Sequence, residues 1–146
     1  MVQFDKKLVA VLNKNCDKGK IMNALAHMSL GLGASVANKD NTAESKNELR
    51  LTDYKDADNN SHKNISEIPF IVLEGNSNKI RELRKEAIAN NIESVDFTNT
   101  MTVGTYEDQI RLSAQTKEQD LEYYGICLFG DWDSVSQLTK KFSLWK

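Results

Sequence analysis

Short apolar runs along the chain are separated by stretches in which apolar residues are spaced differently. The runs cover residues 8–12, 70–73 and 124–130, whereas residues 93–98 alternate between apolar and polar side chains. Continuous runs of this length are typical of strands buried on both faces, and alternation is typical of a strand with two unlike faces. The pattern therefore predicts four core strands.

Apolar residues three and four positions apart follow the first, second and fourth strands and predict a helix after each. A shorter helix is predicted after the third strand. The first helix is predicted over residues 18–34, where Gly31 and Gly33 are expected to weaken its end. Its apolar stripe consists of Ile21, Leu25, Met28 and Leu32. Strands that alternate with helices are typical of α/β domains, so we expect a three-layer α/β/α sandwich around a four-stranded core.

The short helix after the third strand carries a capping signal. Thr105 and Asp108 stand three residues apart, as in a capping box, which predicts a helix over residues 106–114. Its inward-facing positions are expected to be Ile110 and, more weakly, Tyr106 and Ala114.

Residues 38–66 form a polar excursion that cannot build a core of its own. Apolar residues are few here, although the alternation around Leu49 and Leu51 predicts a short edge strand within residues 48–54. The excursion also has the spacing of four calcium-loop ligands, at Asp56, Asp58, Asn60 and Glu67. Ser61 replaces the glycine that such a loop needs, so we expect no metal site.

Length and charge narrow the range of functions. A chain of 146 residues supports one core, so residues 1–146 are expected to form a single domain with the excursion on its surface. A net charge of −2 gives no general attraction to polyanions, and contact with tRNA would need a local basic patch. The start lacks a signal peptide and no apolar run approaches the ~20 residues that span a bilayer, so we expect a cytoplasmic protein without a membrane partner. Cys16 and Cys127 lack metal-ligand spacing and are expected to be reduced thiols.

Candidate chemistry gathers on one edge of the first helix. Lys20, Asn23 and His27 lie at helical spacing, on a line displaced from the apolar stripe. Lys18 and Lys20, with the unpaired N–H groups of the helix start, form a candidate site for phosphate or carboxylate; solvated lysines beside a loop are the alternative. His27 is a candidate for proton transfer or for contact with a terminal phosphate, and packing against a neighbour is the alternative.

Two segments resemble the type II peptidyl-tRNA hydrolases of archaea and eukaryotes. The first helix opens with Gly19, Lys20 and Ile21, and His27 follows seven positions after the lysine. At the other end of the chain, an apolar strand, a glycine and a Val-x-x-Leu-Thr helix correspond to Gly130, Val135, Leu138 and Thr139. The resemblance spans most of the chain. It implies a mixed core sheet and a hydrolase site that needs no metal or cofactor.

Two departures limit how far this resemblance extends. Ala24 stands where the hydrolases have glutamine, and residues 96–101 keep the family's aspartate and Thr100 but lack its arginine and glutamine. The Asp-rich turn around Asp58 and His62 is similar instead to that of a bacterial family of unknown function, domain of unknown function 2000, which shares the fold. The chain most resembles that bacterial family.

The resemblance to the hydrolases implies roles for particular residues. Lys20 is expected to stabilise an oxyanion, Asp96 to order or deprotonate water, and Thr100 to supply a hydrogen bond, with His27 as the fourth catalytic candidate. The alternation of the third strand, however, points Asp96 away from the face that carries Val95. Ligand contacts are expected from Lys18, Asn23, Thr98, Asp58 and His62, the last two closing over a ligand at Lys20.

Three functions are consistent with these patterns. The leading hypothesis is a protein that binds a small anionic or nucleotide-like ligand beside Lys20. The first alternative is hydrolysis of the ester between a peptidyl or acyl group and a nucleotide carrier. The second is a structural homo-oligomer, assembled through a sheet edge or through the end that carries Trp132 and Trp145. A homodimer is the expected assembly.

Overall fold

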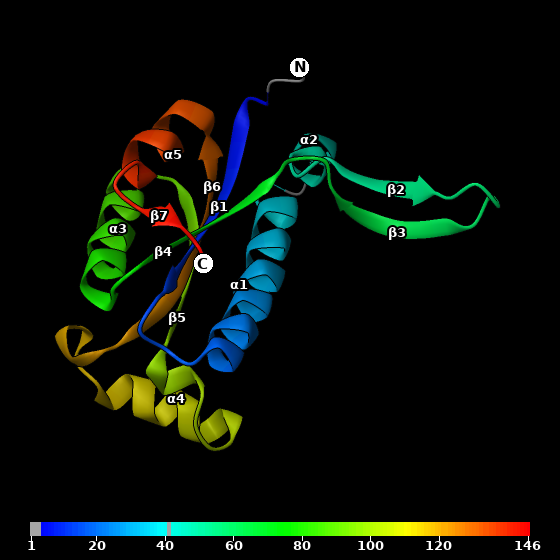
Figure 1. The fold of residues 1–146 in the computed structure, drawn as a ribbon. Coiled ribbons are helices and arrows are strands. Elements are labelled where there is room, and N and C mark those ends of the chain that lie inside the picture. The colour runs from blue at the N-terminus through cyan, green and yellow to red at the C-terminus, as the bar shows by residue number, and fades with distance from the viewer. Residues whose placement is uncertain (1–3, 41) are drawn as a thin grey trace.

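A mixed five-stranded sheet forms the centre of the protein (Figure 1). The computed structural model describes residues 4–40 and 42–146. The strand order is β5-β6-β1-β4-β7, and β1 runs parallel to β4 and antiparallel to β6. The strands are β1 (Lys6–Asn13), β4 (Phe70–Gly75), β5 (Glu93–Thr98), β6 (Tyr123–Asp131) and β7 (Ser143–Leu144).

The four strands predicted from the sequence are all present, and the sheet has one more. β7 pairs with the edge of β4, with Leu144 opposite Leu73 and Ser143 opposite Glu74. Two residues are too few to produce an apolar run or an alternation, so the four-stranded prediction was one strand short.

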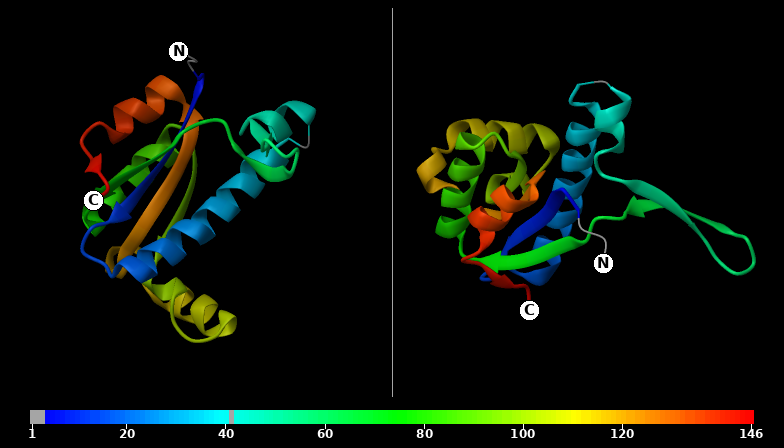
Figure 2. Two further views of the ribbon diagram at one scale, coloured as in Figure 1. Left: turned by 45° about the vertical axis from the view of Figure 1, so that its right-hand side comes forward. Right: turned by 90° about the horizontal axis from the view of Figure 1, so that it is seen from above.

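Helices lie on both faces of this sheet (Figure 2). Alternate residues of β1 point to opposite sides: Leu8, Ala10 and Leu12 pack in the cluster that includes the buried face of α1 (Lys18–Asn38). Val9 and Val11 pack on the other side, against α3 (Ser77–Ala89) and α5 (Trp132–Thr139). None of these helices has the length and hydrophobicity to cross a bilayer, nor does any other helix among the described residues.

α1 is longer than its sequence predicted. It continues through Gly31 and Gly33 to Asn38. A Cβ placed on Gly31 would meet Val95 Cγ1 at 3.7 Å, which is an ordinary van der Waals distance. These glycines therefore neither end the helix nor permit an unusually close contact.

The polar excursion forms a short helix and a separate hairpin. After α2 (Ala43–Asn47), strands β2 (Leu51–Lys55) and β3 (Ser61–Ser66) pair only with each other and project away from the body beside the C-terminal end of α1 (Figure 1). The strand predicted near residues 48–54 is therefore real, but it is not an edge of the core sheet.

The short helix α4 (Tyr106–Gln115) has the predicted capping box and an unexpected orientation. Asp108 N donates to Thr105 Oγ1 at 3.3 Å, and Thr105 N donates to the Asp108 carboxylate at 2.9 Å. No residue of this helix is buried, and Ile110, which was expected to face inward, is 57% exposed. The apolar side of α4 is thus uncovered.

Candidate functional site

A cavity of about 750 Å³ opens between the N-terminal half of α1 and the C-terminal end of β5. The 3-10 turn η1 (Asn99–Met101) and α4 form its third side; Figure 1 shows these elements meeting at one end of the sheet. The lining residues are Asp17, Gly19, Lys20, Asn23, His27, Met28, Val95, Asp96, Phe97, Met101, Thr102 and Gln109.

The polar line expected on α1 faces this cavity. Lys20, Asn23 and His27 are exposed residues of the helix and all three line the hollow. Among the described residues, no hydrogen bond or ion pair engages their side-chain nitrogen and oxygen atoms. Lys20 and His27 are seven residues apart, which corresponds to ~10.5 Å along a helix axis. The cavity wall therefore offers hydrogen-bonding groups along two helical turns.

The N-terminus of α1 is already capped by a carboxylate. Asp17 Oδ2 accepts a hydrogen bond from Lys20 N at 3.3 Å. A negative side chain at this position satisfies the helix dipole and competes with any bound anion for the first-turn N–H groups. The expected anion site therefore reduces to the side chain of Lys20, because Lys18 is exposed and does not line the cavity.

The floor of the cavity is apolar and aromatic. Phe97, 7% exposed, lies beside His27 with ring centroids 5.9 Å apart and planes tilted by 30°. Met28 is buried beneath them, and Met101 is partly exposed at the rim. A planar or apolar part of a ligand would find van der Waals contact here, with the polar line of α1 at its side.

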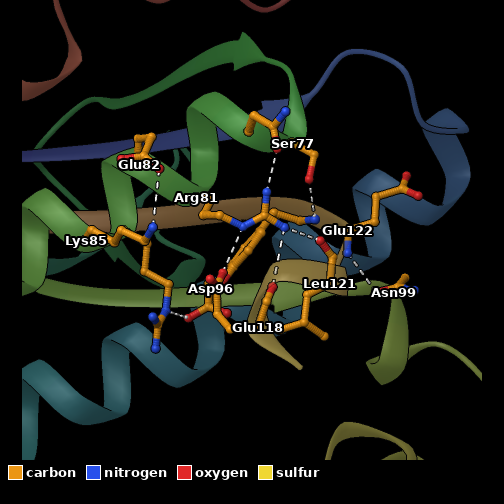
Figure 3. Close-up of polar contacts among 12 residues, drawn as sticks. Ser77, Arg81, Glu82, Lys85, Asp96, Asn99, Glu118, Leu121 and Glu122 are labelled. Atoms are coloured by element: carbon orange, nitrogen blue, oxygen red, sulfur yellow. Dashed lines mark hydrogen bonds and ion pairs between the residues drawn. The ribbon is translucent and has the colours of Figure 1, made fainter. Parts of the chain in front are cut away.

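Asp96 borders the cavity, but its carboxylate is directed elsewhere. Val95 and Phe97 pack with α1, so the alternation of β5 sends the side chain of Asp96 toward α3. There Arg84 Nε donates to Asp96 Oδ1 at 3.0 Å, and Figure 3 shows Asp96 among the side chains of that helix. Burial disfavours the charged form of Arg84, but the hydrogen bond and charge of Asp96 outweigh it and raise the pKa of the guanidinium. The expected pairing of Asp96 with Lys20 across one ligand is not present.

Thr98 and Thr100 lie outside this cavity. Both are buried, with the two hydroxyl oxygens 2.9 Å apart and Thr100 Oγ1 at 2.7 Å from Ser113 Oγ of α4. They line a smaller hollow of about 280 Å³ on the Arg84 side of β5. The hydrogen bond expected from Thr100 to a ligand at Lys20 is therefore unavailable, because its hydroxyl anchors α4 instead.

Asp58 and His62 lie far from Lys20, on the projecting hairpin. His62 Nε2 is 3.0 Å from Asp56 Oδ2, and the N–H groups of Asp58 and Asn60 each donate to Asp56 Oδ1 at 3.0 Å. The hydrogen bond with His62, followed by that from the Asn60 N–H, lowers the pKa of Asp56. The turn is thus organised around the Asp56 carboxylate. In this conformation, neither Asp58 nor His62 reaches a ligand beside Lys20. Within the described parts of the chain, no three His, Cys, Asp or Glu side chains converge on a metal position.

The family assignment follows from comparison with known proteins. A family model described as protein of unknown function (DUF2000) matches residues 6–146. The chain belongs to the DUF2000 family. A solved structure of a protein of unknown function from Agrobacterium tumefaciens matches with a TM-score of 0.80 and 18% sequence identity, covering 99% of this chain and 100% of that one. At that identity the likeness concerns the fold. A comparison with curated protein sequences finds no match.

Three lining residues of this DUF2000 protein gave no signal in the sequence. Met101 and Thr102 follow β5 in a turn, and Gln109 lies on α4. Thr102 Oγ1 donates to Asn99 O at 2.9 Å, which fixes the turn. Gln109 sits at an ordinary helical position, and only the placement of α4 brings it opposite α1.

A second group of polar residues was also missed, on the far side of β5. Arg81 Nε donates to Glu118 Oε2 at 2.9 Å, and Glu118 also accepts from Tyr123 Oη at 2.8 Å (Figure 3). Arg81 additionally donates to the backbone oxygen of Leu121. Burial, and then the hydrogen bond to Glu118, raise the pKa of Tyr123 to about 12. This network ties the segment between α4 and β6 to α3, and we assign it a structural role.

Proposed function

We propose that this DUF2000 protein binds a small anionic or nucleotide-like ligand in the cavity between α1 and β5. The observation that carries the proposal is the line of Lys20, Asn23 and His27, whose polar side-chain groups face the hollow without partners among the described residues. The anionic group of the ligand would lie at Lys20 and its planar or apolar part beside His27 and Phe97.

Size supports a ligand of this class. A volume of about 750 Å³ falls within the ~300–1,000 Å³ of ordinary small-molecule sites. A ligand that contacts both Lys20 and His27 must extend over the ~10.5 Å between those positions along the helix. A nucleotide, with a phosphate at one end and a flat base at the other, has this elongated form.

The charges of the lining support an anionic head. Among the described lining residues, Lys20 is the one lysine or arginine. The two carboxylates of the lining are both occupied, since Asp17 caps α1 and Asp96 pairs with Arg84. A phosphate or carboxylate at Lys20 would therefore meet an unpaired positive charge.

We also infer that the fold is the three-layer α/β/α arrangement of the type II peptidyl-tRNA hydrolases. What supports this is the position of α1 on one face of the mixed sheet and of α3 and α5 on the other. The Gly19-Lys20-Ile21 opening of α1, directly after a central strand, agrees with it.

Binding is favoured over hydrolysis by the position of the acidic and hydroxyl groups. In the hydrolase reading, Asp96 and Thr100 would act on a substrate held at Lys20. The carboxylate of Asp96 is hydrogen-bonded to Arg84, and Thr100 is buried beside α4. Thr100 does not line the cavity and the Asp96 carboxylate is engaged by Arg84, so the hydrolase reading would require a rearrangement of β5 and η1.

The test compares two lysines at the start of α1. AMP and inorganic phosphate are titrated into the wild-type protein, Lys20→Met and Lys18→Met, with isothermal calorimetry and the melting temperature as readouts. We expect Lys20→Met to weaken AMP binding at least fivefold and Lys18→Met to change it less than twofold, because only Lys20 lines the cavity. Equal losses in both variants, or no binding to the wild type, would overturn the proposal.

A further inference from the structure

The apolar side of α4 continues the cavity beyond its rim. Met101, Thr102 and Gln109 line the hollow, and five apolar side chains at this place in the chain are uncovered. These are Met101, Val103, Tyr106, Ile110 and Leu112, with exposed fractions of 37, 45, 71, 57 and 38%. Five partly or largely exposed apolar side chains on one short segment exceed the scattered single residues that are normal on a protein surface.

Helix geometry places Tyr106 and Ile110 beside the cavity rim. At 100° per residue, Tyr106, Gln109, Ile110 and Ser113 fall within about 100° of the helix circumference. Gln109 on this arc lines the cavity, whereas Ser113 lines the smaller hollow on the Arg84 side of β5 and is hydrogen-bonded to Thr100. Tyr106 lies about 60° and Ile110 about 100° from Gln109 around the helix, so both largely exposed side chains lie beside the rim of the cavity without lining it.

The opposite side of α4 is polar. Glu107, Asp108, Arg111 and Gln115 occupy it, and Arg111 forms an ion pair with Asp108. α4 is thus an amphipathic helix whose apolar side is exposed beside the cavity. An isolated helix of ten residues has little stability of its own, so contacts on that side would stabilise it.

The geometry points to a free amphipathic ligand, with an anionic head at Lys20 and an unbranched apolar tail that runs past Met101 and along Tyr106 and Ile110. This inference rests on the proposed function, because it takes the head site at Lys20 from it. It adds the chemical class of the ligand and a second contact surface on α4. The tail would fill the apolar part of the cavity and cover the exposed side of the helix.

A series of alkyl phosphates of increasing chain length tests the inference. Butyl, hexyl, octyl and decyl phosphate, each below its micellar concentration, are titrated into 15N-labelled protein by NMR. Full burial of a methylene group corresponds to about a fourfold gain in affinity, and for a half-covered tail we expect about twofold per methylene. Amide shifts on α1 near Lys20 are expected with every member, and shifts on α4 only with the longer ones.

Two isoleucine variants give a matched comparison. Ile110→Ser is expected to weaken decyl phosphate at least fivefold and to leave butyl phosphate unchanged. Ile88→Ser, at an equally exposed isoleucine of α3 away from the cavity, is expected to change neither. Unchanged binding of butyl phosphate also shows that the Ile110 variant retains a folded cavity.

Each contrary outcome has a distinct meaning. Affinity that does not depend on chain length, with AMP and butyl phosphate still bound, overturns the amphipathic ligand and leaves the proposed function standing. Absence of binding by AMP and by every alkyl phosphate overturns both. A dimer that light scattering shows to dissociate in Ile110→Ser, with no dependence on chain length, assigns the side of α4 to a second copy. Sedimentation of the protein with phosphatidic acid vesicles would assign it to a membrane surface, whereas we expect the protein to stay in the supernatant.

Discussion

Arg84 of α3 donates from Nε to Asp96 Oδ1 over 3.0 Å, so a carboxylate at the rim of the cavity between α1 and β5 is paired from the opposite face of the sheet. This pairing leaves Lys20 as the charged group that a ligand in the proposed site would meet, and it makes Asp96 a structural residue of β5. The distinction can be measured directly.

Asp96→Asn should affect stability and leave binding unchanged. The side chains are 24% exposed for Asp96 and 35% for Arg84, and the loss of a partly screened ion pair costs about 0.5–1 kcal/mol of unfolding free energy. Urea denaturation measures that change, and calorimetry with AMP measures the affinity, which we expect to stay within twofold of the wild type. A tenfold loss of affinity at unchanged stability would place the carboxylate in the site.

Two glycine substitutions should shift stability in opposite directions. A Cβ at Gly125 would lie 2.8 Å from Met28 Cε and 3.2 Å from the backbone oxygen of Val11. Gly125→Ala should therefore destabilise the protein by about 1–3 kcal/mol through overpacking. Gly31→Ala has free space in the middle of α1 and should stabilise it by about 0.5–1 kcal/mol. Chemical denaturation of both variants checks the pair, and a loss of stability in Gly31→Ala would contradict the open contact seen at that position.

The hairpin turn should loosen in acid. The pKa of Asp56 lies below its ordinary value of 3.8, first because of His62 and then because of the Asn60 N–H. A carboxyl group whose pKa is lowered by folding stabilises the folded turn at pH values above its pKa in the unfolded chain. This contribution is lost as the pH falls through the pKa of the folded state. NMR titration should therefore give Asp56 a midpoint below 3.8, with the Asn60 amide following it. His62→Ala should raise that midpoint, while Lys63→Ala should leave it in place; equal midpoints in the wild type and the His62 variant would show that the contact with His62 has no effect in solution.

Cys16 should become more reactive when Glu122 loses its charge. Burial, and then the hydrogen bond from Cys16 Sγ to Glu122 Oε1 at 3.2 Å, raise the pKa of the thiol to about 12. Glu122→Gln removes the negative charge, so the thiolate is less disfavoured and reacts faster. Alkylation by iodoacetamide at pH 8, followed by mass spectrometry, should show faster modification of Cys16 than in the wild type. Asp120→Asn, a nearby acidic residue without this contact, should not alter the rate.

Four of the five strands of the core sheet could be predicted because each of these four carries its own signal. β1 and β6 are continuous apolar runs because both of their faces are buried, whereas the apolar run of β4 is only partly buried. The capping box of α4 was predicted for the same reason, because it depends on residues three apart in the chain. The exposure of Ile110 could not be predicted, since it depends on which neighbour the folded chain brings to that helix.

The candidate site was predictable on α1 and not on β5. The spacing of Lys20, Asn23 and His27 fixes one helix face, and the structure places that face at the cavity. The alternation of β5 also correctly pointed Asp96 away from Val95, whereas the resemblance to the hydrolases grouped Asp96 with Lys20. The periodicity of the strand was the better guide, because it reflects the geometry of this chain.

The projecting hairpin gives the protein a region whose length can change freely. Residues 50–67 include no buried side chain, and Glu67 N donates to Arg50 O at 2.9 Å, so the two ends of the segment already meet. A peptide tag or fluorophore inserted in the turn between β2 and β3 would lie far from both faces of the sheet (Figure 1). The tip of the hairpin is therefore a convenient attachment point for labels that must not disturb the cavity at the other end of α1.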